Sequence, residues 1–137
     1  MKCSIAETKK FAEDLAEKSP ARLYALVGEL GSGKTTFTQF FLRALGIVDS
    51  ITSPTFVIIK SYPLTAQRYT RAYHIDCYRL ENPRELLALG FTEIADDQNN
   101  IIIIEWAERI KELLPSRGVA WITFFHSKRP NERIITY

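Results

Sequence analysis

The eight residues GELGSGKT at positions 28–35 constrain the fold of this chain more than any other feature. They match the G-x-x-x-x-G-K-[ST] pattern, in which glycines let backbone amides surround phosphate groups. In such a loop Lys34 would reach the β- and γ-phosphates, and the hydroxyl of Thr35 would hold Mg²⁺. Because the bound anion sits at the positive end of a helix, the pattern requires a helix directly after the loop.

Both flanks of the loop meet this requirement. Residues 22–27 form a short apolar run typical of a buried parallel strand. Phe37, Phe41 and Leu45 then recur at helical spacing, and Gly46 stands where a helix often ends. The order strand, loop, helix favours a phosphate-binding loop over the alternative, a glycine-rich turn that binds nothing.

Length and composition indicate one ordinary globular domain over residues 1–137. The hydrophobic fraction is 46% and the charged fraction 25%, and a chain of this length can bury a sizeable core but is too short for a second domain. The net charge of +2 gives no electrostatic case for nucleic-acid or membrane binding, and we interpret Lys128, Arg129 and Arg133 as a solvated cluster. Two isolated cysteines, Cys3 and Cys77, indicate a reducing compartment, and with no apolar leader or membrane span we expect a cytoplasmic protein.

The other elements follow from periodicity and breaker residues. Ser4 and Glu7 resemble a capping box that opens a helix over 5–17. An antiparallel hairpin is expected from 56–62 and 68–75, a short helix from 82–87 broken at Gly90, a polar linker over 96–100, a helix over 108–114, and strands over 101–105, 119–125 and 133–137. The prediction is an α/β protein with the P-loop NTPase fold: a mixed, mainly parallel β-sheet flanked by helices, with the nucleotide at the carboxyl ends of its strands.

A second acid is needed to hold Mg²⁺ beside such a loop, and two candidates stand at strand ends. Glu105 follows four isoleucines, and Asp76 follows the weaker apolar run AYHI. Each carboxylate could instead be a solvated group at the end of a strand. The segment SPTF at 53–56 places Thr55 where nucleotide hydrolases often have a switch loop, or it is a plain turn before a strand.

His74 and Asp76 alternate along the predicted strand and therefore share one of its faces. Asp76 could orient or deprotonate a water molecule, with His74 setting its geometry. A cross-strand hydrogen-bonding cluster is the alternative interpretation of the same pattern. The residues alone do not separate the two.

Four segments together resemble the TsaE (YjeE) family, the ATPase of bacterial tRNA threonylcarbamoyladenosine (t⁶A) biosynthesis. They are the loop at 28–37, TSPTF at 52–56, HIDCYRL at 74–80 and IEW at 104–106, and the likeness extends over residues 4–125. The resemblance implies an ATP- or ADP-binding, Mg²⁺-dependent ATPase. It also implies a partnership with the TsaB–TsaD heterodimer, indirect involvement of tRNA, no membrane, and a monomer in isolation. Its turnover would support modification of A37 in tRNAs that read ANN codons, without performing the transfer itself.

The resemblance also assigns roles to particular residues. Asp76, Lys34 and Thr55 would support catalysis, while Thr35 and Glu105 would bind Mg²⁺. The nucleotide would be contacted by Ser4, Ile5, Gly28, Leu30, Gly31, Ser32, Gly33, Lys34, Thr35, Thr36 and Trp106. The tail at 128–133 matches the family's Gly-Arg turn only loosely, so no phosphate role is predicted for Arg133.

Three other functions fit a phosphate-binding loop. A small-molecule kinase would need an arginine-rich lid, and the only extended candidate, residues 81–100, carries the single arginine Arg84. A guanine-nucleotide switch would need an N-K-x-D-like segment, which the sequence lacks. A module that binds ATP only to hold a complex together would lack significant hydrolysis.

Overall fold

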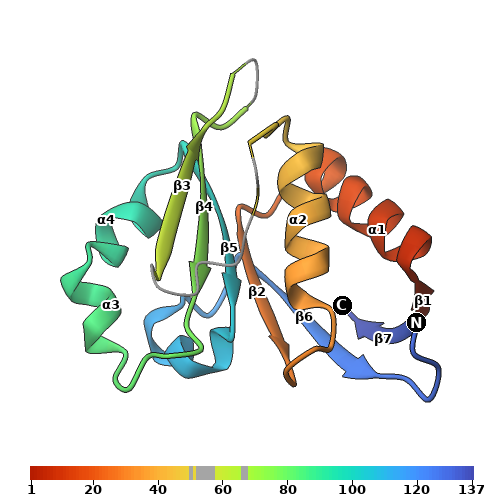
Figure 1. Ribbon diagram of the computed structural model, residues 1–137. Coiled ribbons are helices and arrows are strands. Elements are labelled where there is room, and N and C mark those ends of the chain that lie inside the picture. Colours follow the sequence, from red (N-terminus) through yellow and green to blue (C-terminus); the bar gives the residue numbers. More distant parts are fainter. Residues whose placement is uncertain (50, 52–57, 66–67) are drawn as a thin grey trace.

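The computed structural model describes residues 1–49, 51, 58–65 and 68–137, and its centre is one twisted β-sheet (Figure 1). The described residues form seven strands in the order β1-β7-β6-β2-β5-β4-β3. The strands are β1 (Lys2–Ser4), β2 (Leu23–Gly28), β3 (Ile59–Pro63), β4 (Arg71–Asp76), β5 (Asn100–Glu105), β6 (Val119–His126) and β7 (Glu132–Thr136). The helices are α1 (Ile5–Lys18), α2 (Lys34–Ala44), α3 (Arg84–Ala88), α4 (Phe91–Asp96) and the 3₁₀ helix η1 (Ala107–Leu113).

The middle of the sheet is parallel and its margins are antiparallel. Strand β2 pairs in parallel with both β5 and β6, and β5 pairs in parallel with β4. The hairpin β3–β4 closes one side, while β7 joins β6 to β1 on the other. This confirms the predicted α/β fold with a mixed sheet flanked by helices.

Helices cover both faces of the sheet, so its central strands carry apolar residues on both sides (Figure 1). Helices α1 and α2 pack one core against residues such as Leu26, Ile101 and Ile103. Helices α3, α4 and η1 pack a second core against Ala25, Ile102 and Ile104. None of the helices in the described ranges is both long and apolar enough to cross a membrane.

The sheet register brings several strand ends together. Glu105, the last residue of β5, lies opposite Asp76 on β4 and opposite Leu26 on β2. Strand β2 ends two residues later at Gly28, where the phosphate-binding loop starts. Because these strands are parallel, the loop and both carboxylates meet at one edge of the sheet, where ligands bind in open α/β folds.

Several expected boundaries differ from those in the structure. The capping box of α1 is present as predicted, with Ser4 Oγ accepting from the Glu7 amide. The expected α-helix at 108–114 is instead a 3₁₀ helix over 107–113, and Ile110 has non-helical torsions. Helix α4 and strand β1 were not predicted. Gly90 ends the helix before it but also caps α4 in a left-handed conformation, and the three-residue β1 is held by β7, which is remote in sequence.

Candidate functional site

The loop at 28–35 connects β2 to α2 as its pattern predicts. Gly33 precedes the first residue of α2 in a left-handed conformation, with φ at 110°, and as a glycine it offers no side chain to cap the helix. The amide of Phe37 donates to the Gly33 carbonyl at 3.0 Å and so makes the first bond of the helix. The amides of residues 34–36 precede that bond, so they are available to a ligand at the positive end of α2.

Two glycines of the loop stand where no side chain fits. A Cβ atom added at Gly28 would lie 2.5 Å from the carbonyl oxygen of Phe124 on β6. A Cβ atom at Gly33 would overlap the side chain of Arg133, which reaches the loop from β7. The close approach of the Phe124 backbone explains Gly28, and the left-handed backbone, with φ at 110°, explains Gly33, because the flexible Arg133 side chain could move aside.

Lys34 lies almost entirely inside the protein, with 4% of its surface exposed. Its ammonium group donates to the carbonyls of Gly28 and Glu29 and lies 4.0 Å from the centre of the Trp106 ring. Burial lowers the pKa of Lys34, and the negative charges of carboxylates including Glu105 and Asp76 oppose that shift. A cation in this position would gain from an anionic ligand, because such a ligand replaces the hydration that burial has removed.

A chain of three side chains crosses from the loop to β4. Thr35 Oγ1 donates to Glu105 Oε1 at 2.7 Å, and His74 Nε2 lies 2.5 Å from Glu105 Oε2. His74 is fully buried and Glu105 is 2% exposed. His74 therefore contacts the carboxylate of the neighbouring strand, so for this residue the cross-strand interpretation holds.

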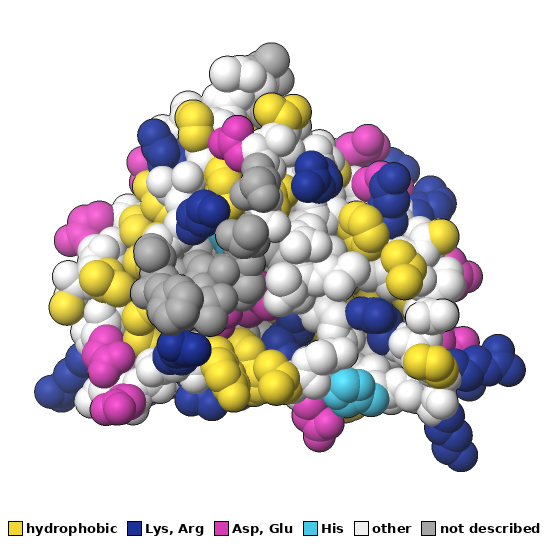
Figure 2. All heavy atoms as spheres, in the orientation of Figure 1, with side chains coloured by type: hydrophobic (Ala, Val, Ile, Leu, Met, Phe, Trp, Pro, Cys, Tyr) yellow, Lys and Arg dark blue, Asp and Glu magenta, His cyan; other side chains and the backbone are white. Residues whose placement is uncertain are grey.

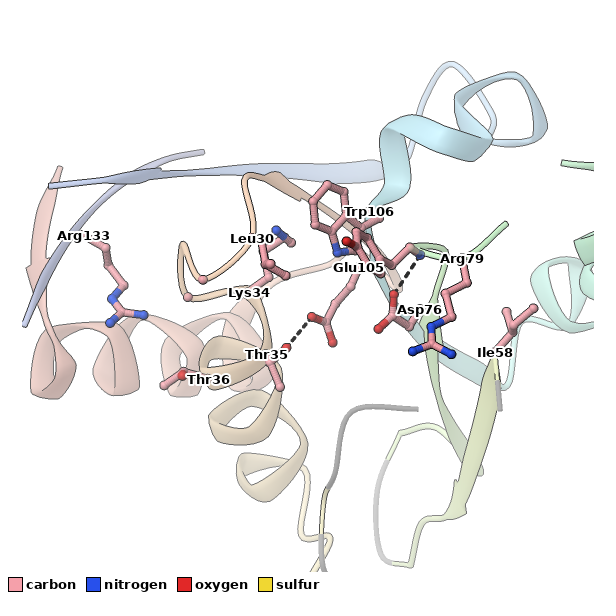
Figure 3. A pocket seen from close by; sticks show the side chains of 13 residues that line it. Leu30, Lys34, Thr35, Thr36, Ile58, Asp76, Arg79, Glu105, Trp106 and Arg133 are labelled. Atoms are coloured by element: carbon pink, nitrogen blue, oxygen red, sulfur yellow. Dashed lines mark hydrogen bonds between the residues drawn. The ribbon is translucent and has the colours of Figure 1, made fainter. Parts of the chain in front are cut away.

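Asp76 lies beside Glu105 in the register but in a different environment. It is half-buried, and its Oδ1 accepts a hydrogen bond from the Tyr78 amide at 2.9 Å. Figure 3 shows Asp76 and Arg79 pointing into the same part of the cavity. The Asp76 carboxylate is thus within reach of a ligand that enters from solvent.

Trp106 follows Glu105 and turns its ring toward the loop. Its backbone is left-handed, with φ at 59°, which is unusual for a residue other than glycine. This turn ends β5 and sets the ring near Lys34 and 4.8 Å from the ring of Tyr78. Strained backbone of this kind concentrates at functional sites.

These groups surround a cavity of about 580 Å³, a size typical of small-molecule sites (Figure 3). Its lining consists of Leu30, Gly31, Gly33, Lys34, Thr35, Thr36, Ile58, Asp76, Tyr78, Arg79, Glu105, Trp106 and Arg133. Most of the predicted site residues thus come together around one cavity.

Some predicted residues lie elsewhere, and one that was set aside lies at the site. Ser4 and Ile5 do not line this cavity, and the Ser4 side chain caps α1. Thr55 lies outside the described residues. Arg133, for which no phosphate role was predicted, lines the cavity beside Gly33. No local signal identifies Arg133, because only the pairing of β7 with β6 and β1 brings it to the loop.

The donor set fits a polyphosphate with a hard divalent cation. Backbone amides, Lys34 and Arg133 supply positive charge or hydrogen-bond donors, while Thr35 and Glu105 supply oxygen ligands. No group of three or more His, Cys, Asp and Glu side chains arranged to hold a metal ion occurs in the described ranges. Proteins usually bind Mg²⁺ through one or two side chains together with substrate phosphates and waters, and Thr35 and Glu105 could supply those side chains.

Comparison with known proteins agrees with this architecture. Residues 3–135 match the model of the family described as threonylcarbamoyl adenosine biosynthesis protein TsaE. The tRNA threonylcarbamoyladenosine biosynthesis protein TsaE of Rickettsia conorii is 44% identical over 113 residues, and that of Bacillus subtilis is 42% identical over 110. These matches cover 81% and 80% of this chain but 62% and 66% of the relatives, so the chain spans less than two thirds of their length.

A solved structure has the same fold as this chain. The crystal structure of YdiB from Bacillus subtilis superposes with a TM-score of 0.75 at 33% sequence identity, covering 98% of this chain and 82% of that one. The family match covers the loop, Asp76, Glu105 and Arg133 alike. The chain therefore belongs to the TsaE family of tRNA threonylcarbamoyladenosine biosynthesis proteins.

Proposed function

We propose that this protein binds ATP with Mg²⁺ in the cavity and hydrolyses it slowly, in support of t⁶A modification of tRNAs that read ANN codons. We further propose that it works with the TsaB–TsaD heterodimer and that tRNA takes part only indirectly. One observation carries the proposal: the Thr35 hydroxyl at the loop is hydrogen-bonded to a buried strand-end carboxylate, Glu105, at 2.7 Å. A hydroxyl and an acid in this arrangement are the protein ligands of Mg²⁺ in phosphate-loop enzymes.

The loop residues would bind and orient the triphosphate. The amides at the start of α2 and the ammonium of Lys34 would contact its oxygens, with Arg133 approaching the same loop beside Gly33. Trp106, packed over Lys34, restricts access of water to that ammonium. Lys34, Trp106 and Arg133 all line the same cavity, which supports this assignment.

Chemistry would depend on the two carboxylates in different ways. Bound Mg²⁺ would neutralise charge that develops on the phosphates, and Thr35 and Glu105 would hold it. Asp76, half-buried at the adjoining strand end, would orient the attacking water or accept its proton. Positioning and charge compensation account for most catalysis in this reaction class, which is what this set of residues offers.

The kinase alternative is less well supported by the packing. Its candidate lid, residues 81–100, contains α3 and α4, whose Leu86 and Phe91 pack into the core beside Ile102 and Ile104. That core lies on the face of the sheet opposite α2, the helix that begins at Lys34. Residues committed to this core cannot close over the phosphates without exposing it.

Phosphate release from ATP tests the proposal when it is measured with the protein alone, with TsaB–TsaD, and with both proteins and tRNA. We expect Mg²⁺-dependent release that rises when TsaB–TsaD is added. ATP binding without release under every condition would instead support a module that only assembles a complex. Transfer of phosphate to a small acceptor would support a kinase.

A further inference from the structure

The histidine beneath the candidate metal ligand has no role in the scheme above, although it is fully buried. His74 is 0% exposed, and its Nε2 lies 2.5 Å from Glu105 Oε2. The other carboxylate oxygen accepts from Thr35 at 2.7 Å. Both oxygens of one buried carboxylate are therefore held by side chains from two different elements, β4 and α2.

We propose that His74 is a positioning residue: its Nε2–H group holds Oε2 of Glu105 so that Oε1 stays directed toward Thr35 and the cation site. The inference rests on the proposed function, because it assigns Glu105 to Mg²⁺. It adds that the orientation of this ligand is set by the protein before any ion or nucleotide binds.

The location of His74 in the sheet makes it a rigid support. Its backbone pairs with Ile103 of β5 on one side and with Lys60 of β3 on the other. The imidazole thus projects from an interior strand toward a carboxylate two residues further along β5 than Ile103. A partner fixed in this way restricts the Glu105 side chain far more than a flexible surface residue would.

The hydrogen-bonding pattern indicates which nitrogen of the His74 imidazole carries a proton. A neutral imidazole has one N–H group, and a carboxylate oxygen can only accept. The second nitrogen, Nδ1, is buried and has no hydrogen-bond partner among the described residues. The arrangement therefore fits a ring that carries a proton on Nε2 and donates it to Glu105, since a tautomer protonated only on Nδ1 would bury a donor that has no partner among the described residues.

Without His74 the carboxylate would have another attractive partner nearby. The negative charge of Glu105 is close enough to raise the pKa of Lys34, against the effect of burial. A carboxylate released from the imidazole would be drawn toward the Lys34 ammonium, which the phosphates also need. His74 therefore keeps two oppositely charged groups available for different parts of one ligand.

Two amide side chains of different length, glutamine and asparagine, distinguish a positioning role of His74 from a packing role. The terminal nitrogen of glutamine can occupy the place of imidazole Nε2, whereas that of asparagine reaches only the place of Nδ1. His74→Gln and His74→Asn both bury an amide, so they disturb the core similarly. Only the glutamine variant can restore the bond to Glu105.

The measurement is the affinity for ADP by calorimetry, in EDTA and in Mg²⁺, reported as the ratio of the two dissociation constants. We expect His74→Asn to reduce the gain from Mg²⁺ by about 10- to 100-fold, the usual effect of losing a partner that orients a metal ligand. His74→Gln should keep the gain to within about threefold. In a Glu105→Gln background, His74→Asn should cause no further loss of the Mg²⁺ effect, because the charged ligand that His74 would orient is already absent.

Several outcomes would overturn the inference. A ratio unchanged in His74→Asn, with affinity reduced equally in EDTA and in Mg²⁺, would show a role in packing alone. Equal losses in the asparagine and glutamine variants would exclude the bond from Nε2. A wild-type protein that binds ADP without any Mg²⁺ effect would overturn the proposed metal site as well, so the two failures are distinguishable.

A second measurement needs no variant of His74. The sequence contains only His74 and His126, so a side-chain ¹⁵N spectrum has two imidazoles to assign, and His126→Gln identifies them. We expect His74 to carry a proton on Nε2, with resonances that move when Mg²⁺ is added to the ADP complex. A proton on Nδ1 alone, or resonances that ignore Mg²⁺, would contradict the inference.

Discussion

Two carboxylates, Glu105 and Asp76, end neighbouring strands at the same level of the sheet, yet their surroundings differ. Glu105 is 2% exposed, and both of its oxygens are engaged by Thr35 and His74. Asp76 lies directly opposite it in the register but is half-buried, with Oδ1 accepting from the Tyr78 amide in the following turn.

The difference shows how one edge of a sheet can prepare two acids for different tasks. A buried carboxylate with both oxygens fixed by side chains is suited to hold an ion in one geometry. A carboxylate nearer to solvent is suited to contact water that enters and leaves. The negative charges of both acids also raise the pKa of the buried Lys34 ammonium, against the effect of its burial.

The largest effect that separates the two acids is expected at Asp76. Asp76→Asn should lower the turnover of bound ATP by at least about 100-fold, the lower end of the range for losing a group that assists proton transfer. Affinity for Mg²⁺–ATP should change little, because Asp76 is not part of the loop. Single-turnover phosphate release beside calorimetry tests this, and a variant that loses binding instead would make Asp76 a ligand.

Lys34→Ala removes the positive charge that both acids face. ATP hydrolysis should fall at least about tenfold, or about 1.4 kcal/mol of transition-state stabilisation. Nucleotide affinity should fall with it, unlike in Asp76→Asn. Lys60→Ala, in the hairpin strand β3, is a matched control for loss of one lysine, and near-normal hydrolysis by the Lys34 variant would contradict the assignment of the loop.

Glu105→Gln should affect the metal rather than the nucleotide. The amide keeps the shape of the side chain but removes its charge, so the gain in ADP affinity on adding Mg²⁺ should shrink by about tenfold, or about 1.4 kcal/mol. Affinity in EDTA should stay near the wild-type value. Calorimetry in both buffers measures this, and a loss of turnover with an intact Mg²⁺ effect would exchange the roles of the two acids.

The smallest expected effect is optical. The Trp106 ring lines the cavity, 4.0 Å from the ammonium that phosphates would bind, whereas Trp121, on β6, packs against the same core without lining the cavity. Adding Mg²⁺–ADP should change tryptophan emission in the wild type and in Trp121→Phe, and leave it unchanged in Trp106→Phe. Emission that ignores saturating nucleotide would indicate that Trp106 only anchors the core.

Local sequence was sufficient for the parts of the site that lie next to each other along the chain. The loop pattern fixed the positions of Lys34 and Thr35, and the isoleucine run located Glu105 at a strand end. Alternation along β4 placed His74 and Asp76 on one side. These features depend on periods of two or 3.6 residues, which a sequence displays directly.

Long-range pairing determined what local patterns missed. Arg133 reaches the loop only because β7 returns beside β6 and β1, and the partner of His74 depended on the parallel register of β4 with β5. The turn of Trp106 into the cavity arose from a left-handed residue, which its strand pattern would not suggest.

The surface charge agrees with the composition. Lysine and arginine side chains do not gather into a single basic patch on the face shown in Figure 2, as the net charge of +2 predicts.

The location of the cation tests the account most directly. Crystals grown with ADP and Mn²⁺, an ion that replaces Mg²⁺ and scatters anomalously, would locate it without reference to activity. The account predicts one anomalous peak in contact with Thr35 Oγ1 and on the side of Glu105 Oε1, with the phosphates along the amides of residues 34–36. A peak at Asp76 and none at Thr35, or phosphates outside the loop, would contradict it.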